Sequence, residues 1–343
     1  MTSLVRPVTI GRMSAPHRIA MAPMTRKRAD ERGVATNLMQ RYYVQRADAA
    51  LIITEGTMID PRCQCVRVPG LIDDAQVEGW RTVTDAVHEA GGRIVVQLWE
   101  PGRLSHHPHG LPVAAMDATP DLLGVVRIAE IVELYRAAAA RATAAGFDAV
   151  EIHAANGSLI DEFLRTSANH RADAYGGGVA NRVRFLLEVV DAVIGEIGAD
   201  RTGVQVAPHI AARALGCPQI VETILHLAAE LGARRLAYLH LAEADWTDAP
   251  EIGQTFRERL RERFPGTILA AGEYTLSKAL RMVGDDLVDV VAFGRAFIAN
   301  PDLPTRLIAG LPLAEPDLTS VYSGDAEGYT TYPRFAAADQ GHR

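Results

Sequence analysis

The sequence predicts an α/β fold, a (β/α)8 TIM barrel built as one domain over residues 1–343. Short apolar runs alternate with longer stretches of helical spacing, and about eight such pairs fill a length typical of this barrel. The apolar runs are continuous, as expected for parallel strands buried on both faces. Polar and glycine residues follow most of the runs, which would gather them at the mouth where barrel strands end.

The expected strands are the short apolar runs. They cover Arg18–Ala22, Leu51–Thr54, Arg93–Leu98, Ala149–His153, Gly203–Ala207, Leu236–His240, Thr267–Ala271 and Val288–Phe293. The expected helices lie between them and include Ala75–Ala90, Ile128–Ala145, Asn181–Ile197, Pro218–Leu231, Gly253–Phe264 and Leu276–Val283. A doubly wound open sheet alternates in the same way, but no Gly-x-Gly-x-x-Gly follows the first strand and the unusual residues are not confined to one switch point.

Two segments fall outside the repeat. Residues 3–16 precede the first strand, and Pro7 with the Gly11-Arg12 break predicts a short hairpin that closes the bottom of the barrel. Residues 100–126 follow the third strand and are rich in Pro, His and Gly. A long loop at that end of a strand is expected to form an active-site loop or lid.

The composition narrows the class of protein. The formal net charge is −7 and no basic run is present, so nucleic acid is not an expected partner. No apolar run approaches the roughly 18 residues that span a bilayer, and the N-terminus lacks the apolar core of a signal peptide. Three cysteines do not make a disulfide framework. The expectation is a cytoplasmic protein with no membrane association.

A phosphate site is indicated by glycines after the last two strands. Gly272 follows the seventh strand, and Gly294 and Arg295 follow the eighth. Glycine allows the backbone to approach an anion closely, and arginine directs two N–H donors at phosphate oxygens. Barrels commonly build phosphate sites from these two loops. The alternative is a tight turn followed by a solvated arginine.

A second site is indicated after the fourth strand, where His153 and Asn156 stand three residues apart. Both side chains can donate hydrogen bonds to one oxygen, which would polarise a carbonyl conjugated to an alkene. The alternative is a buried histidine satisfied by the backbone. Polar residues at other strand ends, including Thr25, Gln97 and Gln205, favour the functional interpretation because they would share the same mouth.

No metal site is expected. Cys63 and Cys65 are two residues apart, but no second Cys or His pair lies at a zinc-like spacing. The segment is therefore interpreted as a loop. His106, His107 and His109 are interpreted as part of a lid that contacts substrate.

These residues resemble the Old Yellow Enzyme family, the FMN-dependent ene-reductases and NAD(P)H:flavin oxidoreductases. The shared motifs run in order through nearly the whole chain. They are Ala22-Pro23-Met24-Thr25-Arg26, Tyr42-Tyr43 with Gln45-Arg46-Ala47, Ile52-Ile-Thr-Glu-Gly-Thr57, Gln97-Leu-Trp99 with Gly102-Arg103, Glu151-Ile-His-Ala-Ala-Asn156-Gly, Tyr175-Gly-Gly177, Asn181-Arg182, Phe293-Gly-Arg295, Asn300-Pro-Asp-Leu303, Glu327-Gly-Tyr329 and Tyr332-Pro333.

The resemblance implies a barrel that holds FMN at its mouth, with NAD(P)H as the reductant, and it assigns roles by motif position. The residues that would contact the flavin ring are Pro23, Met24, Thr25, Gly56, Gln97 and Gln205. Those that would bind the phosphate are Gly272, Gly294 and Arg295. Those that would bind the substrate are His153 and Asn156 at its oxygen, with Trp99 and Tyr329 shaping the pocket.

The chain departs from the family pattern at two chemically central positions. Ser158 stands where the family usually has a Tyr that protonates the substrate, and a serine hydroxyl is a far weaker acid than a phenol of pKa ~10. Gln205 stands where an Arg usually lies beside the flavin, so we expect a lower flavin potential and weaker retention of reduced FMN. Smaller departures are Glu100, where a His is common, and Glu273 beside the phosphate position.

The leading hypothesis is an FMN-dependent oxidoreductase that moves hydride between NAD(P)H, FMN and an α,β-unsaturated carbonyl or related electron-poor compound. Because the Tyr is replaced, one alternative is a flavin-dependent desaturase or isomerase of a specialised metabolite. A third hypothesis is a barrel that has lost its cofactor and acts as a binding protein, which the intact phosphate motif disfavours. Self-association into a homo-oligomer is compatible with each of them.

Overall fold

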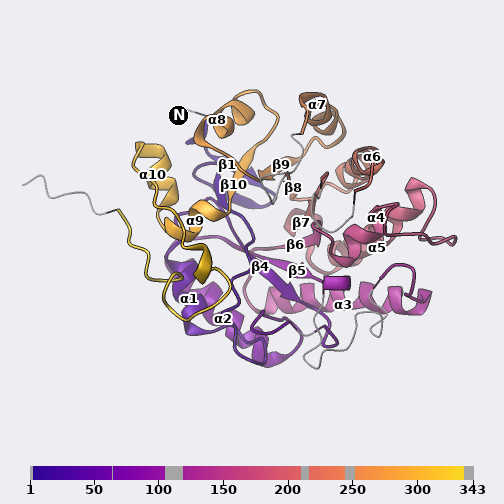
Figure 1. The fold of residues 1–343 in the computed structure, drawn as a ribbon, viewed down its shortest axis with the longest axis horizontal. Helices are drawn as coiled ribbons and strands as arrows, with labels where there is room; N and C mark the ends of the chain where they lie inside the picture. The colour runs from indigo at the N-terminus through magenta and orange to yellow at the C-terminus, as the bar shows by residue number, and fades with distance from the viewer. Residues whose placement is uncertain (1–2, 64, 105–118, 210–215, 244–251, 336–343) are drawn as a thin grey trace, which may run out of the picture.

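Eight parallel strands close into a barrel in the computed structural model, which describes residues 3–63, 65–104, 119–209, 216–243 and 252–335 (Figure 1). In barrel order the strands are β3 (Ile19–Met21), β4 (Ile52–Met58), β5 (Ile94–Trp99), β6 (Ala149–Ala154), β7 (Thr202–Val206), β8 (Tyr238–Ala242), β9 (Thr267–Ala271) and β10 (Val290–Phe293). The barrel closes where β10 pairs with β3, with Val291 opposite Ile19.

Helices surround the strands in Figure 1 and alternate with them along the chain. They are α1 (Asn37–Val44), α2 (Asp74–Glu89), α3 (Val125–Ala144), α4 (Leu159–Leu164), α5 (Val179–Ile197), α6 (Ile220–Ala233), α7 (Gln254–Arg263), α8 (Leu276–Gly284), α9 (Arg295–Ala299) and α10 (Leu303–Ala309). Some start at side-chain caps: the Asp73 carboxylate accepts from the backbone N–H of Gln76 at 2.9 Å, and the Thr275 hydroxyl caps α8 in the same way. Three short 3-10 helices (Gly102–Leu104, Ala199–Arg201 and Leu318–Ser320) complete the described elements.

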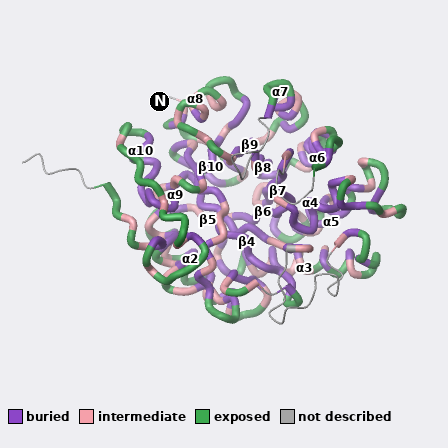
Figure 2. Tube along the Cα trace, in the orientation of Figure 1, coloured by how far each residue is buried: buried purple, intermediate pink, exposed green. Residues whose placement is uncertain are grey.

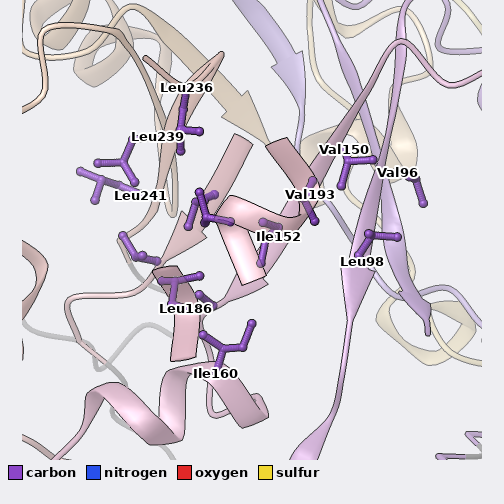
Figure 3. Close-up of a cluster of buried hydrophobic side chains, with 14 of the residues drawn as sticks. Val96, Leu98, Val150, Ile152, Ile160, Leu186, Val193, Leu236, Leu239 and Leu241 are labelled. Atoms are coloured by element: carbon purple, nitrogen blue, oxygen red, sulfur yellow. The ribbon is translucent and has the colours of Figure 1, made fainter. Parts of the chain in front are cut away.

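Strand residues alternate between the helices and the barrel interior. Val96 and Leu98 of β5 join the apolar layer beneath the helices, together with Val150 and Ile152 of β6 (Figure 3). Burying each such side chain stabilises the fold by roughly 1.5–3 kcal/mol. The intervening residues face inward, and Figure 2 shows the barrel strands buried along their length. This period of two decides which polar residues reach the mouth of the barrel.

The expected N-terminal hairpin is confirmed as β1 (Val8–Ile10) and β2 (Met13–Ala15), which pair antiparallel. The backbone N–H of Arg12 donates to the carbonyl of Asp200, just ahead of β7, so the hairpin lies at the N-terminal ends of the strands. Gly11 has a φ of +57° there, and a Cβ would lie 2.1 Å from that carbonyl oxygen. The hairpin therefore closes the end of the barrel opposite the mouth, as predicted.

All eight predicted strands are present, and their ends differ from the expected ones by at most two residues except at the end of β4. β4 continues past Thr54 to Met58, with an irregularity between Ile53 and Gly56. Glu and Gly are depleted from strands, but here one oxygen of the Glu55 carboxylate accepts from the backbone N–H groups of Arg26 and Lys27 at 3.0 and 3.1 Å.

The expected loop at 100–126 is only partly described, because residues 105–118, including His106, His107 and His109, lie outside the described residues. Its last residues are not loop: α3 starts at Val125 rather than at Ile128. No helix in the described ranges is long and apolar enough to cross a membrane. The three cysteines are free thiols.

Candidate active site

His153 and Trp99 lie at the ends of adjacent strands and face the mouth of the barrel. Their rings meet edge to face, with centroids 6.3 Å apart and an interplanar angle of 75°. His153 is 8% exposed, and burial lowers its pKa to about 4, so the imidazole is neutral at physiological pH. Among the described residues, the buried His153 Nδ1 and Trp99 Nε1 have no hydrogen-bond partner. Two polar atoms at the mouth are thus left for a bound molecule.

Asn156 follows in a tight turn after β6. Its φ is +55°, in the left-handed region that asparagine tolerates better than most residues, and Gly157 follows with a φ of +79°. The backbone N–H of Gly157 donates to Asp161 at 2.8 Å, and Asp161 forms a buried ion pair with Arg165 at 2.9 Å. The ion pair and this backbone bond hold the turn that carries Asn156 at the end of β6.

Ser158 is fully buried at the start of α4. Its hydroxyl donates to the backbone carbonyl of His153 at 3.2 Å, and its backbone N–H donates to Ala155 at 3.1 Å. The hydroxyl proton is therefore used in holding the turn after β6. This arrangement gives Ser158 a structural role at the position where the family pattern has an acid.

Four buried, inward-facing residues form a layer inside the barrel. We call this layer the interior network, and its members are Gln97, Glu151, Gln205 and His240. The Gln97 amide donates to Glu151 at 2.7 Å and to the Gln205 oxygen at 3.1 Å. The His240 Nδ1 lies 2.8 Å from the other Glu151 oxygen. Glu151 and His240 were not predicted as site residues, although both lie two positions from another inward-facing residue on the same strand.

The loop after β3 carries Pro23, Met24 and Thr25, all half-buried. Glu55 holds this loop from β4, and burial raises the pKa of its carboxyl to about 7. A Cβ on Gly294 would lie 2.9 Å from the Met24 sulfur, so glycine at 294 lets the Met24 side chain pack closely against this loop.

Gly56 brings a second close approach, against the indole at the mouth. A Cβ on Gly56 would lie 3.2 Å from the ring of Trp99. Gly56 also stands opposite Gln97 in the register of β4 and β5, so these two expected ring-contacting residues lie side by side.

The expected phosphate residues meet at the ends of β9 and β10. Gly272 has a φ of +119° and Glu273 one of +45°, so the turn after β9 is held in the left-handed region. The Glu273 carboxylate lies 3.7 Å from the Arg295 guanidinium, and the two side chains are 43% and 52% exposed. The carboxylate therefore faces the arginine rather than pointing away from it, and it would compete with a phosphate.

Tyr329 lies deeper than a pocket wall was expected to lie. It is fully buried and stacks on Tyr42, with ring centroids 4.1 Å apart, and Arg26 and Arg28 lie over its face at 4.9 and 4.8 Å. We call Arg26, Arg28, Arg46, Tyr42 and Tyr329 the tail anchor. Among the described residues the Tyr329 hydroxyl has no hydrogen-bond partner.

Asp60, Cys63 and Glu100 form a buried cluster that the sequence did not predict. Their possible ligand atoms all lie within 4.8 Å of one another. The Cys63 thiol donates to Glu100 at 3.1 Å, while Asp60 pairs with Arg127 and with Arg62. Burial raises the pKa of Glu100 to about 7. The three groups are thus already satisfied by protein partners.

The residues of the mouth fit a flavin nucleotide. Unpartnered buried polar atoms lie at the substrate side, and an arginine stands beside a left-handed turn at the phosphate end. The amides of Gln97 and Gln205 supply donors and acceptors of the kind that a pyrimidine edge needs.

Known proteins similar to this chain agree with that fit. Residues 3–314 match the NADH:flavin oxidoreductase / NADH oxidase family. The chain is 39% identical to chanoclavine-I aldehyde reductase fgaOx3 of Penicillium roqueforti, over 97% of this chain and 96% of that protein, and 38% identical to putative 12-oxophytodienoate reductase 12 of Oryza sativa subsp. japonica, over 94% and 86%. A solved structure of morphinone reductase in complex with tetrahydroNAD has 43% identity, a TM-score of 0.91 and 98% coverage of both chains. The chain therefore belongs to the Old Yellow Enzyme family and is an FMN-dependent oxidoreductase that uses NAD(P)H.

Proposed function

We propose that this enzyme reduces the C=C bond of α,β-unsaturated carbonyl compounds and that His153 and Asn156 hold the carbonyl oxygen. The buried, neutral His153 with an unpartnered ring nitrogen is the observation that carries the proposal. Neutral donors polarise a carbonyl and stabilise the charge that develops on its oxygen. The names of two relatives, an oxophytodienoate reductase and an aldehyde reductase, support a carbonyl substrate.

The cofactor contacts are part of the proposal. Bound FMN supplies hydride transfer, while the protein supplies orientation and charge stabilisation. The ring contacts are Pro23, Met24, Thr25, Gly56, Gln97 and Gln205, and the phosphate contacts are Gly272, Gly294 and Arg295. Trp99 borders the substrate through its contact with His153. Tyr329 shapes the pocket indirectly, because its buried ring stacks on Tyr42 within the tail anchor.

Ser158 does not supply the second hydrogen of the reduction. Its hydroxyl is fully buried and donates to the carbonyl of His153. Water provides the proton instead, and the lack of a positioned acid slows that step by roughly 10²–10⁴ where protonation limits turnover.

The test separates the two half-reactions by stopped-flow spectroscopy of the FMN-loaded enzyme. Ser158→Tyr is expected to speed reoxidation by cyclohex-2-enone at least tenfold and to leave reduction by NADPH or NADH unchanged. Ser158→Ala is expected to behave like the starting enzyme within about twofold. His153→Ala is expected to lose enone saturation. Loss of reoxidation in Ser158→Ala would make Ser158 the acid and contradict the proposal.

A second candidate function is desaturation or isomerisation, in which hydride passes from substrate to flavin. The burial of the Ser158 hydroxyl favours it, because that direction needs no acid at this position. The same experiment decides between the two. Flavin that a saturated ketone reduces anaerobically in the absence of NADPH and NADH would establish the second function.

A further inference from the structure

The interior network spans four consecutive strands of the barrel. Gln97 stands opposite Glu151 in the strand register, and Gln205 stands opposite His240. All four residues are at most 3% exposed. Glu151 pairs across the sheet with Gly203, which has no side chain, and the Tyr238 ring fills that space, since a Cβ on Gly203 would lie 2.3 Å from it. Side chains from the neighbouring strands therefore enclose the Glu151 carboxylate.

The hydrogen bonds fix the position of one proton in this layer. An ionised carboxylate only accepts, so the 2.8 Å contact between Glu151 and the His240 Nδ1 requires a proton on that nitrogen. The Gln205 amide nitrogen lies 3.3 Å from the same Nδ1 and cannot donate to a nitrogen that carries a hydrogen. The Gln205 amide is thus left to a bound ring. The other nitrogen of His240, Nε2, is buried with no partner among the described residues.

The interior network carries a negative charge that no fixed positive charge within it compensates. With a neutral imidazole, the layer carries the single negative charge of Glu151 in a dry interior. Gln97 and Gln205 are uncharged, so no fixed cation among the four residues offsets it. Reduction of a bound flavin by hydride brings further negative charge to the adjacent pyrimidine edge, and like charges repel strongly where water is excluded. One more proton, on His240 Nε2, makes the Glu151–His240 pair neutral.

We propose that the Glu151–His240 pair takes up a proton from solvent when the flavin is reduced, and so provides a reversible positive charge where the chain has Gln205. His240 acts as a positioning residue that does not touch the substrate. The inference rests on the placement of Gln97 and Gln205 against the flavin ring proposed above, and not on the identity of the enone.

Few other groups compete for that proton. Strands β3, β5, β7, β9 and β10 carry no titratable side chain. Glu55 on β4, whose carboxyl pKa is raised by burial to about 7, accepts from the backbone N–H groups of Arg26 and Lys27 and not from the interior network. His153 stays neutral because burial lowers its pKa to about 4, with His240 among the lesser causes.

Tyr238, which lies beside the pair on β8, also stays out of the exchange. Burial, followed by the nearby Glu151, raises the pKa of its phenol well above its usual value. Among the described barrel strands, the Glu151–His240 pair is thus the titratable pair that lies against Gln97 and Gln205.

The test is the midpoint potential of bound FMN, measured electrochemically between pH 6 and 8.5 without any enone. One extra proton per two electrons adds about 30 mV per pH unit to the slope. The starting enzyme is expected to show this extra slope, and His240→Asn and Glu151→Gln are both expected to lose it. At pH 6.5 the two variants should shift in opposite directions: His240→Asn lowers the potential, because the carboxylate is left unpaired, and Glu151→Gln raises it.

Two further variants separate charge from structure. Gln205→Arg in the His240→Asn background is expected to restore the potential without restoring the slope, because a guanidinium stays charged throughout this range. His226→Asn, the same substitution on the half-buried outer helix α6, is expected to leave both quantities unchanged. Equal slopes in the starting enzyme and both pair variants would overturn the proposal.

A second measurement keeps the proposal testable if the variants lose FMN. Reduction of the starting enzyme by NADPH in weak buffer at pH 7, followed with an indicator dye, should take up about one proton per flavin. Uptake of none would overturn the proposal even if enone reduction proceeds normally. Failure of enone reduction with normal proton uptake would leave this inference standing and reject the proposed substrate.

Discussion

The tail anchor, built on the segments after β3 and around α1, and the interior network, built on β5 to β8, are held together in different ways. In the tail anchor, arginine side chains donate mainly to backbone carbonyls: Arg26 to Val321 and Gly328 at 3.0 and 2.8 Å, and Arg46 to Phe297 and Ile298 at 2.9 Å each. In the interior network, side chains bond to side chains. Backbone acceptors exist whatever the sequence is, whereas a side-chain partner disappears with one substitution. The tail anchor, which fixes the scaffold, follows the family pattern, whereas the departure at Gln205 falls in the interior network.

The largest expected effect is a loss of stability when the tail anchor is disrupted. Arg26→Met keeps an apolar stem but removes the donors to two carbonyls and to the Tyr42 hydroxyl. Leaving such buried acceptors unpaired costs about 3 kcal/mol or more, so we expect Tm to fall by roughly 5–10 °C and the loop that carries Thr25 to loosen. Thermal denaturation and FMN retention on gel filtration measure the two effects.

The matched control for Arg26→Met is Arg259→Met, which removes an exposed arginine that pairs with Glu222 on the outer helices. Its Tm should stay close to that of the starting enzyme. An Arg26→Met protein with unchanged Tm and full FMN content would show that the tail anchor is not what holds this side of the mouth.

The same contrast explains which features could be predicted from the sequence. The barrel was predictable because continuous apolar strands and amphipathic helices repeat along the chain, and His153, Asn156 and Gly294 because they stand at or just after the ends of strands. Glu151 and His240 were missed because they sit inside apolar runs and look like isolated polar residues. Their signal is the period of two, which aligns Glu151 with His153. The hydrogen bond that engages the Ser158 hydroxyl depends on the turn after β6, and residue spacing does not reveal it.

The next effect is on the pH dependence of stability and comes from Glu100, a buried carboxyl outside the interior network. The pKa of Glu100 is raised by burial to about 7, above the ordinary value of 4.5. The folded state therefore holds a proton that the unfolded state has lost, and stability falls as pH rises from about 4.5 to 7. Glu100→Gln, which keeps an acceptor for Cys63 and the N–H of Gly102, should remove this loss, on the order of 1 kcal/mol per pH unit.

Stability measured at pH 5, 6, 7 and 8 tests this prediction for Glu100. The advantage of Glu100→Gln over the starting enzyme should grow between pH 5 and 7 and then level off, because above pH 7 both states are ionised. Glu78→Gln, on the exposed face of α2, should show no such growth. A constant difference for Glu100→Gln would mean that the carboxyl is already ionised at pH 5.

The smallest expected effect is at the phosphate end, where neither arginine anchoring nor burial operates. Glu273 lies 3.7 Å from Arg295, and both side chains are about half exposed. An exposed pair of this kind is worth roughly 0.2–1 kcal/mol, so Glu273→Gln should tighten FMN binding about twofold to fivefold by removing a carboxylate that competes with the phosphate. Fluorescence titration of the apoprotein measures this, and the gain should shrink at 1 M salt, where charges are screened within about 3 Å. Riboflavin, which has no phosphate, should bind both proteins equally. Weaker FMN binding in Glu273→Gln would instead mean that the carboxylate positions Arg295 for the phosphate. This exposed pair would then help to form the phosphate site.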